Sequence, residues 1–502
     1  MKKITALFLI LVMALTTLVA CTAGGTTTGN DQGTDNSADT SVDTGNGDKL
    51  AIKEDKLDGY EYNILVTGNV NYTHGSHHYG NDFYYDENSS DKLSAAKYKW
   101  ITGTEQKFDI TIEVTDKLKW NGANGTGEGY KEINEAYTSS EARYDHCMIG
   151  TYDVANLARN GYLQDINDIA WINLNNSWWD QVANKDLSIQ GTMYYTTGDI
   201  SVNDNAFTHC ILFNKELIKA NDLTSPYDYV NNNTWTLDNF TALAKAGADT
   251  TGIGTEANYV YGLMTWNDSW LQLMASGDER IASVDENGEL ALTMYSERTQ
   301  ALYSAWSEIA KNAAYAINYQ TGRGSSEWDT FRNTTFNDGK ALLYTTLFSS
   351  IVHHRDANVD FGIVPYPKYD ASQENYGHLI SAFHSSFYCV PVHIEDEDIT
   401  GSVSEYMAYY GQQTTMPAYY EDTLQGQFFR DDESADMLDI IFASRAYDAG
   451  ISYKIGDISS KLGTLHSNAT LTFSQIYNER GAMAEAIIET INTQFAEAKG
   501  AE

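Results

Sequence analysis

Hydrophobic positions in the first half of the chain follow two different spacings in turn. The runs at 62–66 (YNILV), 108–114 (FDITIEV) and 144–149 (YDHCMI) have the compact or alternating apolar pattern of strands. Residues 91–107 have helical spacing instead, and a glycine-rich loop leads into a second helix expected from Tyr130. Strands that alternate with helices predict an α/β fold with a largely parallel sheet.

The second half of the chain repeats this style. Thr236 is expected to cap a helix, and the Asn287-Gly288 pair predicts a hairpin within 284–292. Residues 296–313 place their apolar side chains on one helical face, and a terminal helix is expected from Met483, Ile487, Ile491 and Phe495. Further strands are predicted at 207–213, 341–344, 361–364 and 387–390.

The chain begins with Lys2 and Lys3 and an apolar run over 4–18, which ends shortly before Cys21. The run is shorter than the about 20 residues of a membrane span, and with its charged start it predicts a secretory signal over 1–20. The sequence LVAC resembles the lipobox of bacterial lipoproteins, in which the cysteine becomes the lipidated first residue. An ordinary signal peptide with a cysteine nearby by chance is the alternative.

The segment after Cys21 is polar and lacks aromatic residues as far as Lys49. Such a segment buries too little surface to offset its ordering entropy, so we expect a flexible linker over 21–56. A lipidated cysteine on such a linker predicts a protein held at the extracellular face of the cell membrane.

Composition narrows the partners and the size of the core. The 32 basic and 69 acidic residues give a net charge of −37, so nucleic acid is not an expected partner. The about 450 residues after the linker exceed one ordinary core, which predicts two lobes. Cys147, Cys210 and Cys389 lie in apolar runs and are expected to be buried free thiols, because no CxxC occurs.

Aromatic residues are unusually numerous, with 35 Tyr and 10 Trp. Both side chains combine a stacking face with a polar group, which suits polar ligands with apolar faces, above all sugars. Much of this aromatic content is also expected in the core.

Six blocks occur in an order that resembles the bacterial extracellular solute-binding proteins of family one, the lipid-anchored receptors of ABC importers. The blocks cover nearly all of the chain after the linker. They are YDHCMIGTYDVANLARNGYLQDIND, GTMYYTTGDISVNDNAFTHCILFNKEL, NTWTLDNFTALAK, TFNDGKALLYT, FGIVPYPKYD and PAYYEDTLQGQFFRDDESADMLDIIFASRAYD.

The resemblance implies a maltose-binding-like, class II periplasmic-binding-protein fold, with two α/β lobes and one solute in the cleft between them. Lobe 1 is expected from 57–206 with 384–450, and lobe 2 from 207–383 with 451–502. Crossings between the lobes are expected near 205–207, 381–385 and Gly450. It further implies a monomer without cofactor or metal, which closes around a sugar and presents it to an ABC permease.

Candidate ligand contacts lie where strands end, because open α/β sheets bind ligands there. Tyr152 and Asp153 follow the third strand, and Asn69 follows the first. A carboxylate accepts hydroxyl hydrogen bonds and a phenol stacks on a sugar, although Asp153 also suits an Asx turn or a helix N-cap.

Other candidates flank the expected crossings. Asp199 and Asn203 approach the first crossing, where turn chemistry is the alternative. Phe383 and His384 lie at the second crossing, although a lone histidine is more often a hydrogen-bonded structural residue.

A tryptophan-rich stretch belongs to the expected second lobe. Trp266 and Trp270 are four residues apart and would share one helical face, as a stacking platform or as core, with Asn267 beside them. Trp178 and Trp179 are expected in the core instead.

Other chemistries find weaker support. His74, His77 and His78 lie in a predicted loop without carboxylates at chelating spacing, and 252–257 matches GxGxxA but follows a helix rather than a strand. A surface-anchored glycoside hydrolase remains the rival class, since acidic pairs are plentiful. The run at 431–433 precedes a helix, however, where acids suit the N-terminal dipole. The same receptor fold with a non-sugar solute is the third possibility.

Overall fold

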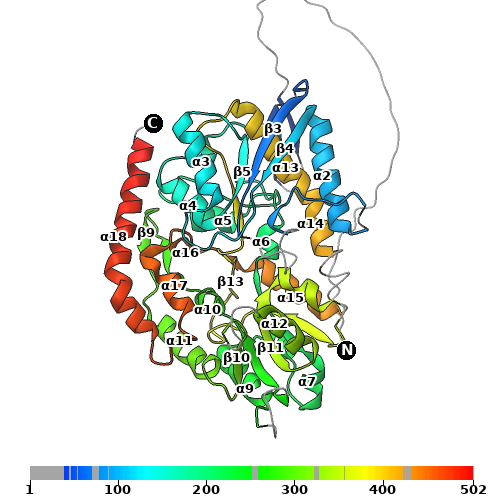
Figure 1. The fold of residues 1–502 in the computed structure, drawn as a ribbon, viewed down its shortest axis with the longest axis vertical. Coiled ribbons are helices and arrows are strands. Elements are labelled where there is room, and N and C mark those ends of the chain that lie inside the picture. The colour runs from blue at the N-terminus through cyan, green and yellow to red at the C-terminus, as the bar shows by residue number, and fades with distance from the viewer. Residues whose placement is uncertain are drawn as a thin grey trace, which may run out of the picture. The chain divides into compact units, whose positions relative to one another are not determined.

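Two β-sheets, each covered by helices, organise the chain (Figure 1). The computed structural model describes residues 39–43, 47–53, 55–69, 79–88, 90–251, 258–321, 327–355, 357–421, 424 and 431–500. The α/β class and the strands expected in both halves of the chain are confirmed. The described residues contain no helix that is long and apolar enough to cross a membrane.

The first sheet has the strand order β14-β5-β3-β4, with bounds Ser386–Cys389, His146–Gly150, Tyr60–Val66 and Ile110–Asp116. Strand β3 pairs in parallel with β4 and β5, while β14 is antiparallel to β5. Its connecting helices are α2 (Lys92–Phe108), α3 (Glu128–Ser139) and α4 (Thr151–Arg159), and α13 (Glu397–Gln413) packs on α2.

The second sheet has the strand order β10-β7-β11-β6-β12, with bounds Ala316–Asn318, Tyr261–Thr265, Ala341–Leu347, His209–Asn214 and Phe361–Val364. Strands β10, β7 and β11 run in parallel, so their carboxyl ends meet at one edge of the sheet. Helix α9 (Leu237–Ala246) begins at Thr236, whose hydroxyl accepts a hydrogen bond from the Asn239 amide as expected of a cap.

The remaining elements connect these sheets or cover them. The predicted hairpin is present as β8 (Ala282–Val284) and β9 (Leu290–Leu292). The others are β1 (Asp39–Asp43), β2 (Lys49–Lys53), η2 (Ile166–Asp168), α5 (Gln181–Leu187), α6 (Asn203–Ala206), α7 (Lys215–Ala220), α8 (Pro226–Asn231), α10 (Ser269–Ser276), α11 (Glu297–Ala310), α12 (Trp328–Asn337), η4 (Phe348–His354), β13 (His378–Leu379), α14 (Thr415–Pro417), α15 (Asp432–Ala443), β15 (Arg445–Ala446), α16 (Ala449–Ser452), η6 (Ile455–Asp457), α17 (Ile458–Gly463) and α18 (Phe473–Gly500).

The folded part begins earlier than expected. We predicted a flexible linker over 21–56, but β2 pairs with β1 and packs on α13. Leu50 and Ile52 are buried, and Lys53 forms an ion pair with Asp398 at 3.2 Å. The alternating apolar residues of KLAIK therefore form a strand. The predicted signal, Cys21 and most of the linker lie outside the described residues.

Three segments lie side by side between the two sheets. The amide of Ser381 donates to the Phe207 carbonyl at 2.9 Å, and Ile380 donates to the Ala446 carbonyl at 3.1 Å. β13 also pairs in parallel with β15. The chain thus passes between the sheets through hydrogen-bonded segments near the positions expected from the sequence for the crossings.

Helix α15 departs from the expected division of the chain. We expected 384–450 to join the first lobe, but α15 packs on β12 of the second sheet. Tyr227 Oη lies 2.9 Å from Ser434 Oγ, and Asp431 accepts from the Ser434 amide as the N-cap. Met437 and Leu438 are buried, so this amphipathic helix covers the sheet it contacts. The cap also explains part of the acidic run at 431–433.

Two core predictions are confirmed and one is partly wrong. Cys147, Cys210 and Cys389 are buried free thiols. Trp178 and Trp179 are buried, and both donate their indole N–H to the Glu405 carboxylate, at 3.0 and 2.7 Å. In α18, Ile491 and Phe495 are buried as expected, but Met483 is exposed and Ile487 only half-buried. Ala484 and Ile488 face the core instead, so the buried positions 484, 488, 491 and 495 alternate spacings of four and three rather than repeating every four.

Candidate functional site

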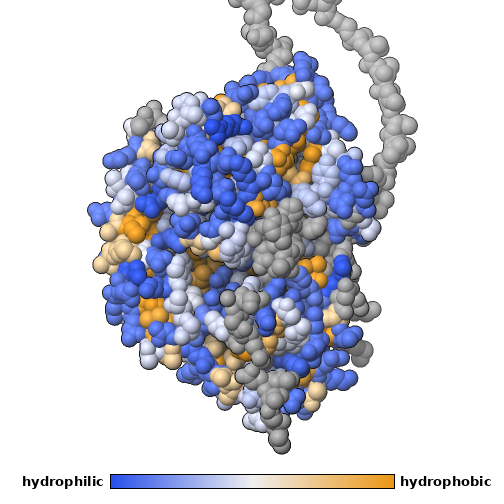
Figure 2. Space-filling model, viewed as in Figure 1, coloured by the Kyte–Doolittle hydropathy of each residue, from blue (hydrophilic) through white to orange (hydrophobic). Residues whose placement is uncertain are grey.

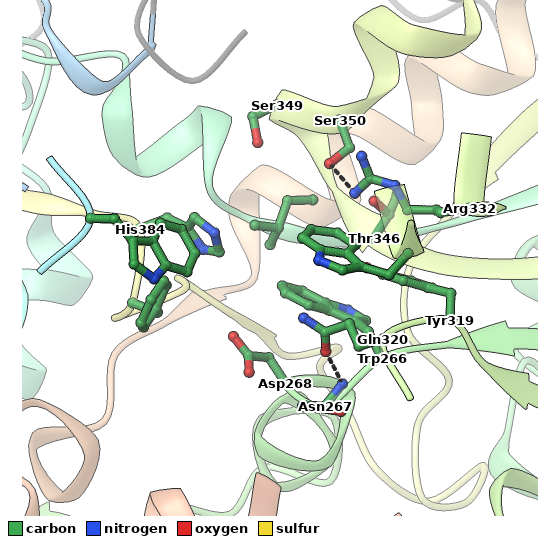
Figure 3. A pocket seen from close by; sticks show the side chains of 14 residues that line it. Trp266, Asn267, Asp268, Tyr319, Gln320, Arg332, Thr346, Ser349, Ser350 and His384 are labelled. Carbon is green, nitrogen blue, oxygen red and sulfur yellow. Dashed lines mark hydrogen bonds between the residues drawn. The ribbon is translucent and has the colours of Figure 1, made fainter. Parts of the chain in front are cut away.

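A pocket of about 350 Å³ opens between segments from the two sheets (Figure 3). In Figure 2 the face of the molecule is hollowed between the parts that carry the two sheets. Most of the wall of this pocket comes from segments that follow β7, β10 and β11, at the shared carboxyl edge of the second sheet. The lining residues are Trp120, Trp266, Asn267, Asp268, Tyr319, Gln320, Trp328, Arg332, Thr346, Leu347, Ser349, Ser350, Phe383 and His384.

Three aromatic rings form a stacked row on one wall. Trp266 directly follows β7 and Tyr319 directly follows β10. The parallel pairing of these strands places the two rings nearly parallel, with centroids 6.4 Å apart and an angle of 12°. Trp328, at the start of α12, stacks on Tyr319 at 6.0 Å and 21°. The row makes this wall apolar and aromatic; Trp266 and Tyr319 are buried in it, and Trp328 is its most accessible ring.

The opposite wall comes from segments that border the first sheet. Trp120 follows β4 and is 58% exposed, and its ring meets Phe383 edge-on at 4.8 Å. His384 stacks on Phe207 at 5.4 Å, and its Nδ1 lies 2.9 Å from Ser381 Oγ. Burial, with a contribution from Arg332, lowers the pKa of His384 to about 4, so this ring is neutral at pH 7.

Polar groups complete the pocket beside the aromatic row (Figure 3). The Gln320 side-chain oxygen accepts from the backbone N–H of Asn267 at 3.0 Å. The Asn267 side-chain oxygen accepts from the Asn318 side-chain amide at 3.1 Å. With both oxygens engaged as acceptors, the side-chain NH₂ groups of Gln320 and Asn267 are the hydrogen-bond donors that these residues can offer to a ligand. Asp268 precedes α10, and burial raises the pKa of its carboxyl to about 6.

Arg332 brings a buried guanidinium to the wall behind Tyr319 and Trp328, 5.6 Å from the centre of each ring. It donates to Asp329 at 2.7 Å and to Ser350 Oγ at 3.4 Å. This pairing fixes the guanidinium and compensates its charge within the wall.

Four of the ten residues predicted to contact a ligand line the pocket: Trp266, Asn267, Phe383 and His384. A fifth, Asn69, lies behind it. Its amide donates to the carbonyls of Phe383 and Gly122, each at 3.0 Å, and its oxygen accepts from the Asn121 amide at 2.7 Å. Asn69 thereby ties the loop that follows Trp120 to the segment that carries Phe383.

Trp270 lies in α10, away from the lining. Its ring stacks on Tyr303 at 6.2 Å, and the Lys311 ammonium lies 5.6 Å from its centre. The spacing argument placed Trp266 on the same helical face, but α10 begins at Ser269, so Trp266 precedes the helix and points elsewhere.

Tyr152 and Asp153 also have structural partners. Asp153 accepts from the Gly127 amide at 2.8 Å and the Tyr130 amide at 3.4 Å, and thus holds the start of α3 rather than capping α4. The Lys454 ammonium lies 5.3 Å from the centre of the Tyr152 ring. Burial and then Asp268 raise the pKa of Tyr152, so this phenol lies within electrostatic range of the pocket carboxylate.

Asp199 and Asn203 also have structural partners. Gln412 donates to Asp199 at 2.9 Å, and burial raises the pKa of that carboxyl to about 7. The Asn203 amide donates to the Tyr79 carbonyl, and its oxygen accepts from the Ser386 amide. Asp199 thus holds its loop to α13, and Asn203, at the start of α6, ties the first crossing to β14.

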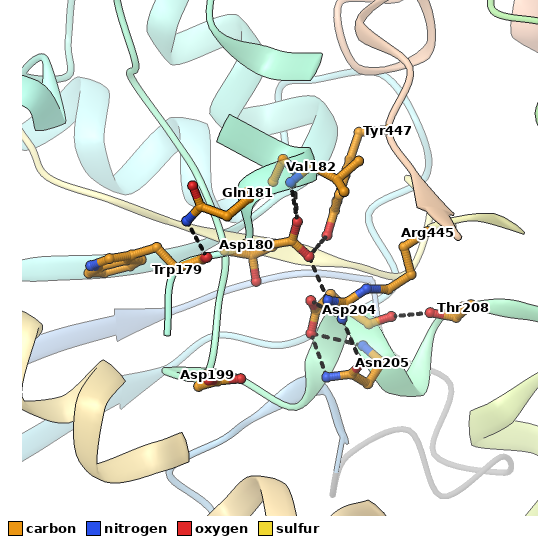
Figure 4. Close-up of polar contacts among 12 residues, drawn as sticks. Trp179, Asp180, Gln181, Val182, Asp199, Asp204, Asn205, Thr208, Arg445 and Tyr447 are labelled. Carbon is orange, nitrogen blue, oxygen red and sulfur yellow. Dashed lines mark hydrogen bonds and ion pairs between the residues drawn. The ribbon is translucent and has the colours of Figure 1, made fainter. Parts of the chain in front are cut away.

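Arg445 lies at the centre of a polar network (Figure 4). Its guanidinium pairs with Asp180 at 2.7 Å and Asp204 at 3.0 Å, and it donates to the Asn205 oxygen at 2.6 Å. Tyr447 also donates to Asp180, at 3.0 Å. One side chain from the β15 crossing thus ties α5 to α6 through two buried carboxylates.

Sequence reasoning missed most of the pocket. Trp120 follows the strand FDITIEV, and the rule that selected Asn69 and Tyr152 would have selected it too. Asp268 adjoins a residue that we did select. Tyr319, Gln320, Trp328 and Arg332 reach the site from positions more than 50 residues after Trp266, and only sheet pairing reveals their proximity.

Metal chemistry was not expected. Within the part of the chain that the structure describes, no three His, Cys, Asp or Glu residues cluster as a metal site would require. His74, His77, His78 and 252–257 lie outside that part.

Comparison with known proteins identifies relatives. A family model described as bacterial extracellular solute-binding protein matches residues 99–426. No curated protein sequence matches the chain.

Solved structures show the same fold at low sequence identity. The ABC substrate-binding protein Lmo0181 of Listeria monocytogenes, in complex with cycloalternan, is 12% identical with a TM-score of 0.55, over 86% of this chain and 99% of that one. The lacto-N-biose-bound protein of a Bifidobacterium longum ABC transporter is 12% identical with a TM-score of 0.56, over 87% and 98%. UgpB of Mycobacterium tuberculosis, in complex with glycerophosphocholine, is 15% identical with a TM-score of 0.53, over 84% and 99%.

Proposed function

The chain belongs to the bacterial extracellular solute-binding proteins, and from this premise we propose that it is the carbohydrate receptor of an ABC importer. In this account the solute binds in the pocket between the two sheets, the lobes close around it, and the closed form delivers it to a membrane permease. Lobe 1 carries the first sheet and lobe 2 the second, with α15 assigned to lobe 2.

The row formed by Trp266, Tyr319 and Trp328 is the observation that carries the assignment to carbohydrates. Sugar rings present apolar C–H faces that stack on aromatic rings and a rim of hydroxyl groups that need hydrogen bonds. The pocket supplies both, because Asp268, Asn267 and Gln320 lie beside the row. The sugar complexes of the Listeria and Bifidobacterium proteins agree with this assignment.

Two alternatives remain distinct from this proposal. A glycoside hydrolase needs two carboxyl groups that face each other across the scissile bond. Among the described lining residues, Asp268 is the one carboxylate. A non-sugar solute is the other alternative, and the glycerophosphocholine complex of the Mycobacterium protein gives it support.

We also propose that Cys21 is lipidated after removal of 1–20 and that the protein acts as a monomer at the extracellular face of the membrane. The support is the lipobox-like LVAC and the polar segment that follows it. A tether of this kind would keep the receptor beside its permease.

The function is tested with residues 22–502, which retain every described residue. Thermal unfolding is measured across a panel of oligosaccharides, glycerophosphodiesters and peptides, because a bound solute raises the melting temperature by mass action. Chromatography of the same mixtures reports cleavage. We expect stabilisation by a carbohydrate with no products. Bond cleavage would overturn the receptor, and stabilisation by peptides or phosphodiesters alone would overturn the sugar.

A further inference from the structure

Asp268 is half-buried, and it differs from the buried carboxylates that the structure describes. Those carboxylates have partners: Asp180 and Asp204 pair with Arg445, and Glu405 accepts from two indoles. For Asp268, no hydrogen bond or ion pair to its side chain is found among the described residues, although it precedes α10 as a capping residue would. Its carboxylate faces the pocket (Figure 3).

The unpaired state of Asp268 has a cost that a ligand can remove. The residue is half-buried, so water reaches its carboxylate in the open pocket. Closure around a solute expels that water, and a charge taken out of water without a partner is strongly unfavourable. Unless the carboxyl takes up a proton, the solute must therefore provide the groups that compensate Asp268.

Arg332, the cation of the described lining, already has partners of its own. Its Nη2 donates to Asp329 at 2.7 Å, and its Nη1 donates to Ser350 at 3.4 Å. Because Asp329 compensates the guanidinium, the pocket retains the one negative charge of Asp268. His384 is neutral at pH 7 and does not change this balance.

Two kinds of donor could serve Asp268, and the surroundings favour one of them. Neutral hydroxyl groups satisfy the oxygens but leave the negative charge in the closed pocket. A protonated amine satisfies the oxygens and also cancels the charge. Aromatic faces attract such a cation as well, and five of the lining residues are Trp, Tyr or Phe.

We propose that the solute is an amino sugar, held with its protonated amine against Asp268 and its ring on the row formed by Trp266, Tyr319 and Trp328. This inference rests on the proposed function, because it assumes that a carbohydrate enters this pocket. It adds the charge of the solute and the residue that selects it.

The test uses sugars that differ at one carbon. Residues 22–502 are titrated calorimetrically with glucose, glucosamine and N-acetylglucosamine, with the β-1,4-linked disaccharide of each, and with galactose and galactosamine. We expect the amine-bearing member to bind about tenfold more tightly, or better, than its hydroxyl and acetylated counterparts.

Two variants assign the preference to one carboxylate. Asp268→Asn keeps the size of the side chain and breaks no described hydrogen bond, so it is expected to fold and to lose the preference. Asp278→Asn removes the same charge from an exposed position just beyond the other end of α10. This control variant should keep the preference for amine-bearing sugars.

The outcomes separate this inference from the proposed function. Equal or weaker binding of the amine-bearing sugars, or a preference that survives in Asp268→Asn, overturns the amino sugar and leaves the carbohydrate receptor in place. If no sugar on this or the wider panel binds, the carbohydrate receptor is overturned, and the amino sugar with it.

Discussion

The indole of Trp266 lies nearly parallel to the phenol ring of Tyr319, with centroids 6.4 Å apart and an angle of 12° between the planes. The two residues are far apart in sequence but each directly follows a strand, and those strands pair so that Thr265 lies beside Asn318. Sheet pairing thus builds the wall of the pocket. The proposed carbohydrate site depends on this wall and on Asp268 beside it.

Trp120 and Trp270 should separate binding from stability. Trp120 is 58% exposed and lines the pocket, so Trp120→Ala should weaken carbohydrate binding about tenfold, since stacking contributes roughly 1 kcal/mol or more, and should leave stability nearly unchanged. Trp270 is buried outside the lining, so Trp270→Phe should lower the free energy of unfolding by about 1–3 kcal/mol without changing the affinity. Calorimetric titration and urea unfolding of both variants check this. If Trp270→Phe weakened binding while Trp120→Ala lowered only the stability, the ligand would bind outside this pocket.

The free energy of unfolding should depend on pH through Asp268. Burial raises the pKa of its carboxyl from 3.8 to about 6 in the folded protein, so the ionised form opposes folding. Asp268→Asn should therefore stabilise the solute-free protein by about 1–3 kcal/mol at pH 7.5. This gain should shrink as the pH falls through 6 and vanish near pH 4, where the wild-type carboxyl is protonated in both states.

Urea unfolding at several pH values measures that difference, with Asp278→Asn as the control at an exposed site. A pH-independent effect of Asp268→Asn, or loss of stability at pH 7.5, would contradict the assignment of an unpaired carboxylate.

Arg445 should stabilise the crossings between the sheets. Arg445→Met leaves Asp180 and Asp204 buried without their cation, so the free energy of unfolding should fall by about 3–5 kcal/mol. Arg143 pairs with acids at the surface, and Arg143→Met should cost less than about 1 kcal/mol. Guanidinium unfolding curves compare the two, and similar losses would show that the buried network has no special role.

The proposed membrane tether should depend on Cys21. In a bacterial host that lipidates exported proteins, the wild-type chain should remain with the membrane fraction and incorporate labelled palmitate. Cys21→Ser should stay unlabelled. Fractionation with radiolabelling measures both properties, and label on the serine variant would refute lipidation at Cys21.

The sequence predicts the elements well but only part of the site. Individual strands and helices follow from local apolar spacing and turn signals, as the cap at Thr236 and the hairpin at Asn287-Gly288 illustrate. KLAIK was assigned to a linker because a short strand in a polar context gains its stability from α13, far along the chain.

Site prediction selected Trp266 for its helical spacing with Trp270, but Trp266 lines the pocket because it directly follows β7, a strand that was not predicted. It failed where spacing was read as a helix, as for Trp270, and where the partner came from a distant strand, as for Tyr319 and Trp328. Asp153 and Asp199 were chosen for their chemistry, but their carboxylates accept from Gly127 and Gln412 in the folded protein.

Hydrogen–deuterium exchange of residues 22–502, with and without a saturating carbohydrate, tests the central claim most directly. A solute bound between the two walls of the pocket should slow exchange in peptides from both walls at once. These peptides lie around Trp120 and Phe383 on one side, and around Trp266, Tyr319 and 346–350 on the other. Protection of one wall alone, or protection confined to segments outside this pocket, would contradict the account.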